Sequence, residues 1–314
     1  MPLHPQAERF LKTWNSLGEP PMETQPVDVV RRSILAASGL LKGCPELARL
    51  EERRIPGPRG DIRIKIYTPF GPGPFGIALY FHGGGWVLNS IDTHDDLVRR
   101  LTDAAGCVFV SVDYRLAPEH EYPAAVEDGY AAVQWVAAHA RELNADPDRI
   151  AVVGDSAGSN VAAVACLMAR DQHGPAIRHQ TLAYPITDCD LDRPSYHENA
   201  DGYFLTLGQM RWFWDLYCPD VTRRTEAYVS PLRAASLRGL PPALIFTAEY
   251  DPLRDEGEAY AAALQAAGVP TTLRRFDGLI HAYLRRVETF DAAGETIRTI
   301  GAKLRTAFAQ PMRS

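Results

Sequence analysis

Apolar and polar positions along the chain form short runs typical of strands and longer runs with helical spacing. Asp61–Pro69 alternates polar and apolar residues, as a half-exposed strand does. With Glu52–Ile55 and the PGPRG turn before it, this run predicts a hairpin at the edge of a sheet. Further strands are predicted at Gly76–Phe81, Cys107–Tyr114, Ile150–Gly154, Gln180–Pro185, Ala243–Asp251 and Thr271–Phe276. The more apolar of these runs indicate burial on both faces, as in a parallel sheet.

Helical spacing recurs between the predicted strands. In Ala124–Leu143, apolar residues at Val126, Tyr130 and Val133 fall on one helix face. Further helices are predicted at Leu97–Ala105, Ala157–Arg170, Asp255–Ala267 and about Ala292–Phe308. Strands that alternate with helices in this way are typical of the α/β class, with a mostly parallel central sheet flanked by helices.

Two regions depart from this alternation. About the first forty-five residues have mixed, helical character, and residues 187–224 form a long stretch without strands. This second region is rich in aromatic residues: Tyr196, Tyr203, Phe204, Trp212, Phe213, Trp214 and Tyr217. A long insertion between strands is usually functional or disordered, and the aromatic content argues against disorder. It therefore predicts a functional insertion such as a lid.

Composition excludes several classes of function. The chain has 314 residues, 46% of them hydrophobic and 23% charged, which is ordinary for a globular protein with a sizeable core. Its net charge of −6 and its lack of a basic stripe argue against nucleic acid or an anionic membrane as the main partner. The longest apolar run, Val161–Ala169, is far too short to span a membrane. The N-terminus also lacks the pattern of a secretory signal.

The five cysteines are widely spaced and form no CxxC pair, so they indicate neither a zinc knuckle nor a disulfide framework. A reducing cytoplasm is the simplest location for such a chain. Cys107 and Cys166 stand in apolar runs and are expected to be small core residues. Because the chain has no HExxH motif and no Cys/His cluster, we expect no metal and no cofactor.

The strongest chemical signal is the serine in RIAVVGDSAG, Ser156. An apolar strand precedes this GxSxG motif, and the helix-forming run SNVAAVACLMA follows it. That setting is the one a nucleophile elbow requires, and it places Ser156 where helix N–H groups favour negative charge. The alternative is a tight structural turn with an incidental serine.

A second signal is HGGGW, His82–Trp86, directly after a predicted strand. Consecutive glycines allow backbone N–H groups to approach a ligand closely, as a developing oxyanion in acyl transfer requires. The N–H of Ala157, after the serine, would add a third donor. The rival is a phosphate-binding loop, but the segment lacks the Lys-Ser/Thr pair of a P-loop.

A nucleophilic serine needs a base and an acid, and for a serine on an elbow of this kind the chain order is Ser, then acid, then His. Of His173, His179, His197 and His281, the first two precede a predicted strand and the third lies in the aromatic insertion. His281 follows a strand and is therefore the favoured base.

For the acid, Asp251 ends the strand before and is favoured. Asp255 is expected to cap the helix that follows, and Glu249 is a weaker candidate inside the strand end. Elsewhere, His94-Asp95-Asp96 is expected to be a polar helix start that caps its own helix.

Four motifs, HGGGW, DYRLAPEHEYPAAVED, GDSAGSN and DPLRDEG with a later histidine, stand in this order in the chain. Together they resemble the hormone-sensitive-lipase-like family (family IV) of bacterial carboxylesterases on the α/β-hydrolase fold. The resemblance runs from about Glu51 to the C-terminus. It implies a helical cap from residues 1–43 and 187–224, over a core from residues 44–186 and 225–314.

The resemblance also implies roles for single residues. Ser156 would be the nucleophile, His281 the base and Asp251 the residue that orients it. The oxyanion hole would consist of the N–H groups of Gly84, Gly85 and Ala157. Gly83 would shape the loop and His82 would brace it, while Asp113-Tyr114-Arg115 and Glu119 would hold neighbouring loops together. Candidate pocket walls are Trp86, Phe204, Leu205 and Trp212, although such aromatic residues equally suit the core of a cap.

The expected partner is a small ester with a short- to medium-chain acyl group, and a homodimer is left open. Ser159 and Ala282 stand where the family often has glycine, and these two departures are expected to affect loop shape and substrate range. The motifs do not separate an esterase from an amidase or acyltransferase. A ligand receptor on a hydrolase-like scaffold is the alternative from another class, although here all catalytic positions are occupied.

Overall fold

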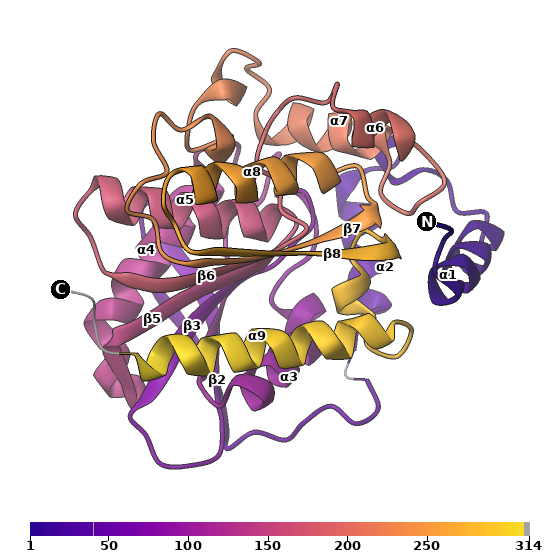
Figure 1. Cartoon of the computed structure of the whole chain (residues 1–314). Helices are drawn as coiled ribbons and strands as arrows, with labels where there is room; N and C mark the ends of the chain where they lie inside the picture. Colours follow the sequence, from indigo (N-terminus) through magenta and orange to yellow (C-terminus); the bar gives the residue numbers. More distant parts are fainter. Residues whose placement is uncertain (40, 311–314) are drawn as a thin grey trace.

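The computed structural model describes residues 1–39 and 41–310, and its centre is one eight-stranded sheet. The strand order is β1-β2-β4-β3-β5-β6-β7-β8 (Figure 1). The strands are β1 Arg49–Gly57, β2 Gly60–Thr68, β3 Phe75–Phe81, β4 Val108–Asp113, β5 Ala145–Asp155, β6 Ile177–Ala183, β7 Ala243–Tyr250 and β8 Thr271–Ile280. β2 is antiparallel to both of its neighbours, and every other adjacent pair is parallel. The α/β class, the mostly parallel sheet and the edge hairpin are confirmed.

Strand ends differ from the prediction where the pattern of apolar residues is weak. β8 continues to Ile280, four residues beyond the predicted end at Phe276. Its middle carries exposed polar residues because it lies at the edge of the sheet, so its apolar signal is broken. His179 lies inside β6 rather than before a strand, which corrects its expected position.

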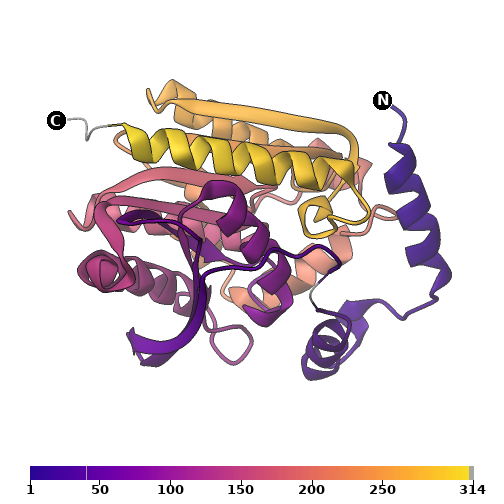
Figure 2. The same ribbon diagram turned by 90° about the horizontal axis from the view of Figure 1, so that it is seen from below.

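Helices cover both faces of the sheet. α3 (Asp95–Ala105) and α9 (Asp291–Ala309) pack on one face, and α4 (Ala124–His139), α5 (Ala157–Asp171) and α8 (Arg254–Ala266) lie on the other (Figures 1 and 2). Successive side chains of β3 enter the two cores in turn, because neighbouring strand residues point to opposite faces. Cys107 and Cys166 are both buried, as predicted.

The remaining helices gather near the edge where the parallel strands end (Figure 1). They are α1 Pro5–Ser16, α2 Val27–Ala36, α6 Pro194–Glu198 and α7 Leu207–Tyr217. Six short 3₁₀ helices complete the described chain: η1 Met22–Thr24, η2 Asp92–His94, η3 Ala140–Leu143, η4 Arg223–Thr225, η5 Pro231–Arg233 and η6 Tyr283–Arg285. Ligands of open α/β sheets bind at this carboxyl edge, so these helices are placed to cover a site there. Within residues 1–39 and 41–310, no helix is long and apolar enough to cross a bilayer.

Candidate active site

The serine of the GDSAG motif forms the corner between β5 and α5. β5 ends one residue before Ser156 and α5 begins one residue after it. The backbone of Ser156 has φ 53° and ψ −122°, a region that residues other than glycine rarely adopt. The corner depends on two glycines: a Cβ on Gly154 would lie 2.4 Å from Gly158, and one on Gly158 would lie 2.0 Å from the Phe81 carbonyl oxygen. The chain therefore places the serine hydroxyl at the carboxyl edge of the sheet.

His281 bridges this serine and a buried aspartate. Its Nε2 lies 3.0 Å from Oγ of Ser156, and its Nδ1 lies 2.7 Å from Oδ2 of Asp251. His281 directly follows β8 and Asp251 directly follows β7, so two neighbouring strands present them side by side. The second carboxylate oxygen of Asp251 accepts the N–H of Leu253 at 2.9 Å. Asp251 is wholly buried, so its hydrogen bonds are to protein groups of fixed geometry.

The aromatic ring of Tyr184 meets His281 edge to face, with ring centroids 4.7 Å apart. Tyr184 comes directly after β6, and its backbone has a positive φ of 37°. The sequence pattern places Tyr184 inside the predicted strand Gln180–Pro185, so it gave no signal of this contact. Because its ring is buried against the imidazole, it restricts where His281 can move.

The glycine loop follows β3 and lies beside the serine. Gly84 has φ 123° and Gly85 has φ 60°, both in the region that favours glycine. Within the described chain, the N–H groups of these two residues have no hydrogen-bond partner, whereas the N–H of Gly83 is bound to Asp155. The N–H of Ala157 is the first of α5 and so has no partner within its helix. These three N–H groups are therefore available to a ligand oxygen.

His82 stabilises the glycine loop from behind. Its Nδ1 donates to the carbonyl of Gly83 at 2.9 Å, and its ring stacks on Tyr114 with centroids 4.4 Å apart. The hydroxyl of Tyr114 in turn donates to the carbonyl of His82 at 2.6 Å. Burial lowers the pKa of His82 to about 3, so the ring is neutral and unsuited to be the base at neutral pH.

The other loops named from the family pattern are tied together by ion pairs and hydrogen bonds. Arg115 pairs with Asp128 of α4 at 2.7 Å. Glu119 pairs with Arg31 of α2 at 2.8 Å, and the same arginine donates to the carbonyl of Val87 beside the glycine loop. α2 is thus bound directly to the loops around the site.

α7 packs its aromatic side chains on the glycine loop. Trp86 is fully buried, stacks on Tyr217 with centroids 4.1 Å apart, and donates its indole N–H to Asn160 at 3.3 Å. The ring of Phe213 lies against Gly85, where an added Cβ would meet it at 2.2 Å. Trp86 thus anchors α7 to the loop, and Phe213 is the aromatic residue that contacts the loop itself.

The other candidate pocket residues lie in residues 187–224, one of the two segments expected to form the cap. Phe204 packs against Phe10 of α1 with centroids 5.8 Å apart and lies beside the guanidinium of Arg286. Leu205 is buried, whereas Trp212 is half-buried and contacts Phe213. Phe204 therefore connects the two segments that were expected to form the cap.

The alternative acids have other partners. Asp255 does not cap its own helix as expected, since Leu253 is the N-cap and Asp255 accepts the N–H of Ser195 at 2.8 Å. Glu249 accepts the N–H of Gly278 at 2.6 Å.

His94 also differs from its expected role. It stands at the N-cap of α3 but forms no side-chain cap there. Instead its Nε2 faces Asp155 at 3.4 Å.

The alternative bases lie away from the serine. His179 is buried in β6, and burial lowers its pKa to about 3. His197 is exposed on α6, and His173 is exposed as well. In the part of the chain that the structure describes, no three His, Cys, Asp or Glu side chains are arranged to hold a metal ion.

As a unit, the arrangement combines a hydroxyl, a hydrogen-bonded imidazole oriented by a carboxylate, and nearby free N–H groups. This combination suits attack on an acyl carbon, because the imidazole can take the hydroxyl proton while the N–H groups receive the developing negative oxygen.

Comparisons with known proteins point in the same direction. The pattern of the alpha/beta hydrolase fold matches residues 78–285. The chain is 44% identical over 264 residues to Carboxylesterase NlhH of Mycobacterium tuberculosis, covering 81% of this chain and 82% of that protein. It is 35% identical over 311 residues to an arylesterase of Saccharolobus solfataricus, covering 98% of this chain and 100% of the other.

Solved structures are similar over nearly the whole chain. A thermostable esterase from Pseudomonas putida has a TM-score of 0.93 and 40% identity, with 99% of both chains covered. A hyperthermophilic esterase from Pyrobaculum calidifontis also has a TM-score of 0.93, at 39% identity, and covers 98% of this chain and 99% of its own.

Proposed function

Because this chain belongs to the alpha/beta hydrolase fold family, and within it to the hormone-sensitive-lipase-like (family IV) carboxylesterases, it is a carboxylic ester hydrolase, and we propose that Ser156, His281 and Asp251 are its catalytic triad. One observation carries the proposal: His281 contacts Oγ of Ser156 through one ring nitrogen and Asp251 through the other. That is the relation in which a base activates a serine while a carboxylate fixes its tautomer.

Acylation begins when Nε2 of His281 takes the hydroxyl proton of Ser156 as Oγ bonds to the ester carbon. The carbonyl oxygen becomes an oxyanion, and the N–H groups of Gly84, Gly85 and Ala157 stabilise it. The bond to the alcohol then breaks, and the alcohol leaves with the proton held by His281. Asp251 remains a carboxylate and stabilises the imidazolium that forms in between.

Deacylation repeats the same steps with water. His281 takes a proton from water as its oxygen attacks the acyl-enzyme, and the same N–H groups hold the second oxyanion. Collapse releases the carboxylic acid and returns the proton to Ser156, which restores the starting state.

Short- to medium-chain acyl esters are the proposed substrates. Phe213 lies on Gly85, and Ser156 is only 7% exposed, so little open space surrounds the nucleophile. Phe204 and Trp212 are proposed as pocket walls, and Trp86 and Leu205, which are buried, would shape the pocket from behind.

We also propose that residues 1–43 and 187–224 act together as the cap on a core of residues 44–186 and 225–314; residues 40 and 311–314 lie outside the described chain. Contacts between Phe10, Trp14 and Phe204 join the two cap segments. The ion pair of Arg31 with Glu119 joins the first segment to the core.

The test is hydrolysis of p-nitrophenyl butyrate by the wild type, Ser156→Ala and, as a matched control, the exposed Ser236→Ala. We expect the wild type and the control to be equally fast and kcat of Ser156→Ala to fall by about 10,000-fold or more. A p-nitroanilide of the same acid and added alcohol acceptors separate an esterase from an amidase or acyltransferase. Equal rates for Ser156→Ala and wild type would overturn the proposed triad.

A further inference from the structure

Asp155, immediately before Ser156, is a buried carboxylate that joins the serine corner to the glycine loop. Its Oδ1 accepts the hydroxyl of Tyr80 at 2.6 Å and the backbone N–H of Gly83 at 2.8 Å. A Cβ on Gly83 would lie 2.6 Å from the other carboxylate oxygen, so the loop lies directly on this side chain. The position of Asp155 therefore sets the position of the N–H groups that follow Gly83.

A second buried histidine faces this carboxylate. Nε2 of His94 lies 3.4 Å from Oδ1 of Asp155, and the two residues are 1% and 2% exposed. The His94 ring is also close to the rings of Tyr80 and His82, with centroids 5.9 and 5.5 Å apart. His94 is therefore buried beside Asp155 and packs against His82, the first residue of the glycine loop.

The partners of Nδ1 indicate where His94 carries its proton. Nδ1 lies 2.9 Å from Oγ1 of Thr93, whose single hydroxyl proton can go either to Nδ1 or to the carbonyl of Ser90. If the Thr93 hydroxyl donates to Nδ1, the neutral ring carries its proton on Nε2. If the hydroxyl donates to the carbonyl of Ser90, Nδ1 carries a proton, and Nε2 is then protonated only in the imidazolium. A bare Nε2 would direct its lone pair at the carboxylate, which is repulsive. Nε2 has no well-formed hydrogen bond among the described residues, so its 3.4 Å approach to Oδ1 of Asp155 is an electrostatic contact, which is favourable only when Nε2 carries a proton.

The charges nearby agree with an ionised Asp155. Burial would raise the pKa of its carboxyl, but His94, Arg285 and the Tyr80 hydroxyl outweigh burial and hold the pKa below its usual value. Burial, and then the like charge of Arg285, lower the pKa of His94.

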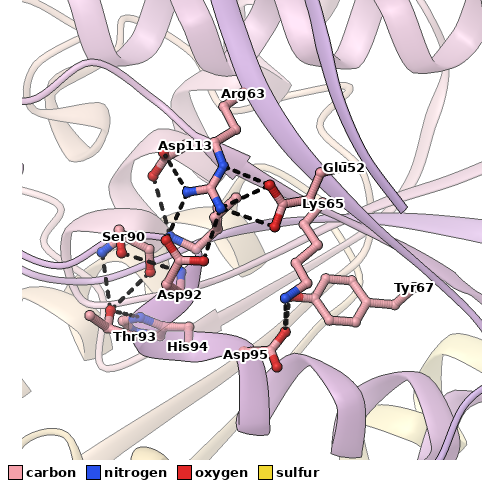
Figure 3. Close-up of polar contacts among 11 residues, drawn as sticks. Glu52, Arg63, Lys65, Tyr67, Ser90, Asp92, Thr93, His94, Asp95 and Asp113 are labelled. Carbon is pink, nitrogen blue, oxygen red and sulfur yellow. Dashed lines mark hydrogen bonds and ion pairs between the residues drawn. The ribbon is translucent and has the colours of Figure 1, made fainter. Parts of the chain in front are cut away.

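Ion pairs on β2 fix the backbone that carries His94 (Figure 3). Arg63 holds both oxygens of Asp92, at 2.7 and 3.0 Å. Lys65 pairs with Asp95 at 2.7 Å, and Tyr67 donates to the same carboxylate at 2.8 Å. Because Asp92 and Asp95 lie on either side of His94 in the chain, these ion pairs hold the backbone on both sides of it.

The geometry points to His94 as a positioning residue: through Asp155 and the N–H of Gly83, it holds the glycine loop where Gly84 and Gly85 can bind the oxyanion. This inference rests on the proposed function, since it assigns that loop to catalysis. It predicts that His94 affects the transition state more than substrate binding, because the oxyanion forms only during reaction.

The experiment compares His94→Phe with His94→Gln in the full-length protein. Phenylalanine fills the site without a donor, whereas the amide of glutamine can place an N–H where Nε2 was. We expect His94→Phe to lower kcat about 10- to 100-fold, less than the roughly 100- to 1000-fold effect of losing an oxyanion donor outright. KM should stay within about threefold, and His94→Gln should remain within about threefold of wild-type kcat because it keeps the donor.

Two further readouts separate positioning from general damage. Phenylboronic acid, which forms a tetrahedral adduct with an active serine, should bind His94→Phe more weakly in parallel with the loss of kcat. The exposed His197→Phe is the matched control and should behave as wild type. Wild-type kcat in His94→Phe, or equal slowing of the Phe and Gln variants, would overturn the inference. A wild type no faster than Ser156→Ala would overturn the proposed function, and this inference with it.

Discussion

Nε2 of His281 lies 3.0 Å from Oγ of Ser156, although 125 residues separate them in the chain. The contact arises because both residues stand directly at the carboxyl ends of their strands, β8 and β5, within one sheet. The order of the strands in the sheet therefore brings the base and the nucleophile together, since the two residues do not belong to one local sequence motif.

Asp251→Asn should lower kcat about 1000- to 10,000-fold with little change in KM. The asparagine amide would donate to Nδ1 of His281, which leaves the proton on Nε2 and removes its capacity to accept from Ser156. Steady-state kinetics on p-nitrophenyl butyrate measures this. Glu249→Gln and Asp255→Asn are the controls, since these side chains bind Gly278 and Ser195 instead, and both should keep most of the activity. A larger loss of kcat in Glu249→Gln or Asp255→Asn than in Asp251→Asn would show that the substituted residue, and not Asp251, is the acid of the triad.

Phe213→Ala should shift the acyl preference toward longer chains. The Phe213 ring lies against Gly85, so its removal opens space beside the oxyanion loop. We expect kcat/KM for octanoate relative to acetate esters to rise about tenfold, the scale on which pocket methylenes discriminate. The ratio is measured on a p-nitrophenyl ester series, with the exposed Phe70→Ala as the matched control. An unchanged ratio would place the acyl group elsewhere.

Tyr184 should act through its ring and not through its hydroxyl. The ring packs on His281, whereas no described residue accepts or donates a hydrogen bond at the hydroxyl. Tyr184→Phe is therefore expected to keep wild-type kcat and stability. Tyr184→Ala should lower the free energy of unfolding by about 3–5 kcal/mol, as for other large-to-small core changes, and lower kcat by freeing the imidazole. Chemical denaturation and kinetics test both, and a slow Phe variant would show that the hydroxyl is used.

Glu256 makes the stability of the fold depend on pH. Burial raises the pKa of this carboxyl to about 8 from an ordinary value of 4.5, although it accepts the N–H of Thr187 at 2.6 Å and the hydroxyl of Tyr196 at 2.9 Å. Between these two values the unfolded chain loses the proton and the folded chain keeps it. Raising the pH through this window therefore destabilises the fold, by up to about 1.4 kcal/mol per pH unit.

Glu256→Gln should remove this dependence. The free energy of unfolding of the variant, minus that of the wild type, should increase from about pH 5 to pH 8 and level off above it. Urea denaturation at a series of pH values measures the difference, and the exposed Glu288→Gln should give a curve parallel to wild type. A parallel curve for Glu256→Gln would show that Glu256 is ionised in the fold at neutral pH.

Local signals in the sequence were sufficient for the elements that carry the site. The elbow at Ser156 could be predicted because a strand, a turn and a helix follow one another directly in the chain. His281 and Asp251 could be chosen because Asp251 ends one predicted strand and His281 follows the next, and the carboxyl ends of parallel strands meet at one edge of the sheet. These inferences needed strand positions and not side-chain contacts.

Roles that depend on distant partners could not be predicted. Asp255 resembles a helix cap in sequence, but its carboxylate accepts the backbone N–H of Ser195 in the insertion. His94 also resembles a cap, yet its ring meets Asp155, which is far along the chain. Tyr184 carries no motif, and its contact with His281 exists only once β6 and β8 are placed in one sheet. Such contacts follow from packing, which periodicity does not encode.

The central claim is that Ser156 is a nucleophile activated by His281, and covalent labelling tests it most directly. The wild type, Ser156→Ala and His281→Ala are each treated with a fluorophosphonate, and the adduct is located by intact mass and peptide mapping. We expect one adduct per chain on the peptide that contains Ser156, none in Ser156→Ala, and a rate at least about 1000-fold lower in His281→Ala. An adduct on another residue, or none on a wild type that hydrolyses esters, would contradict it.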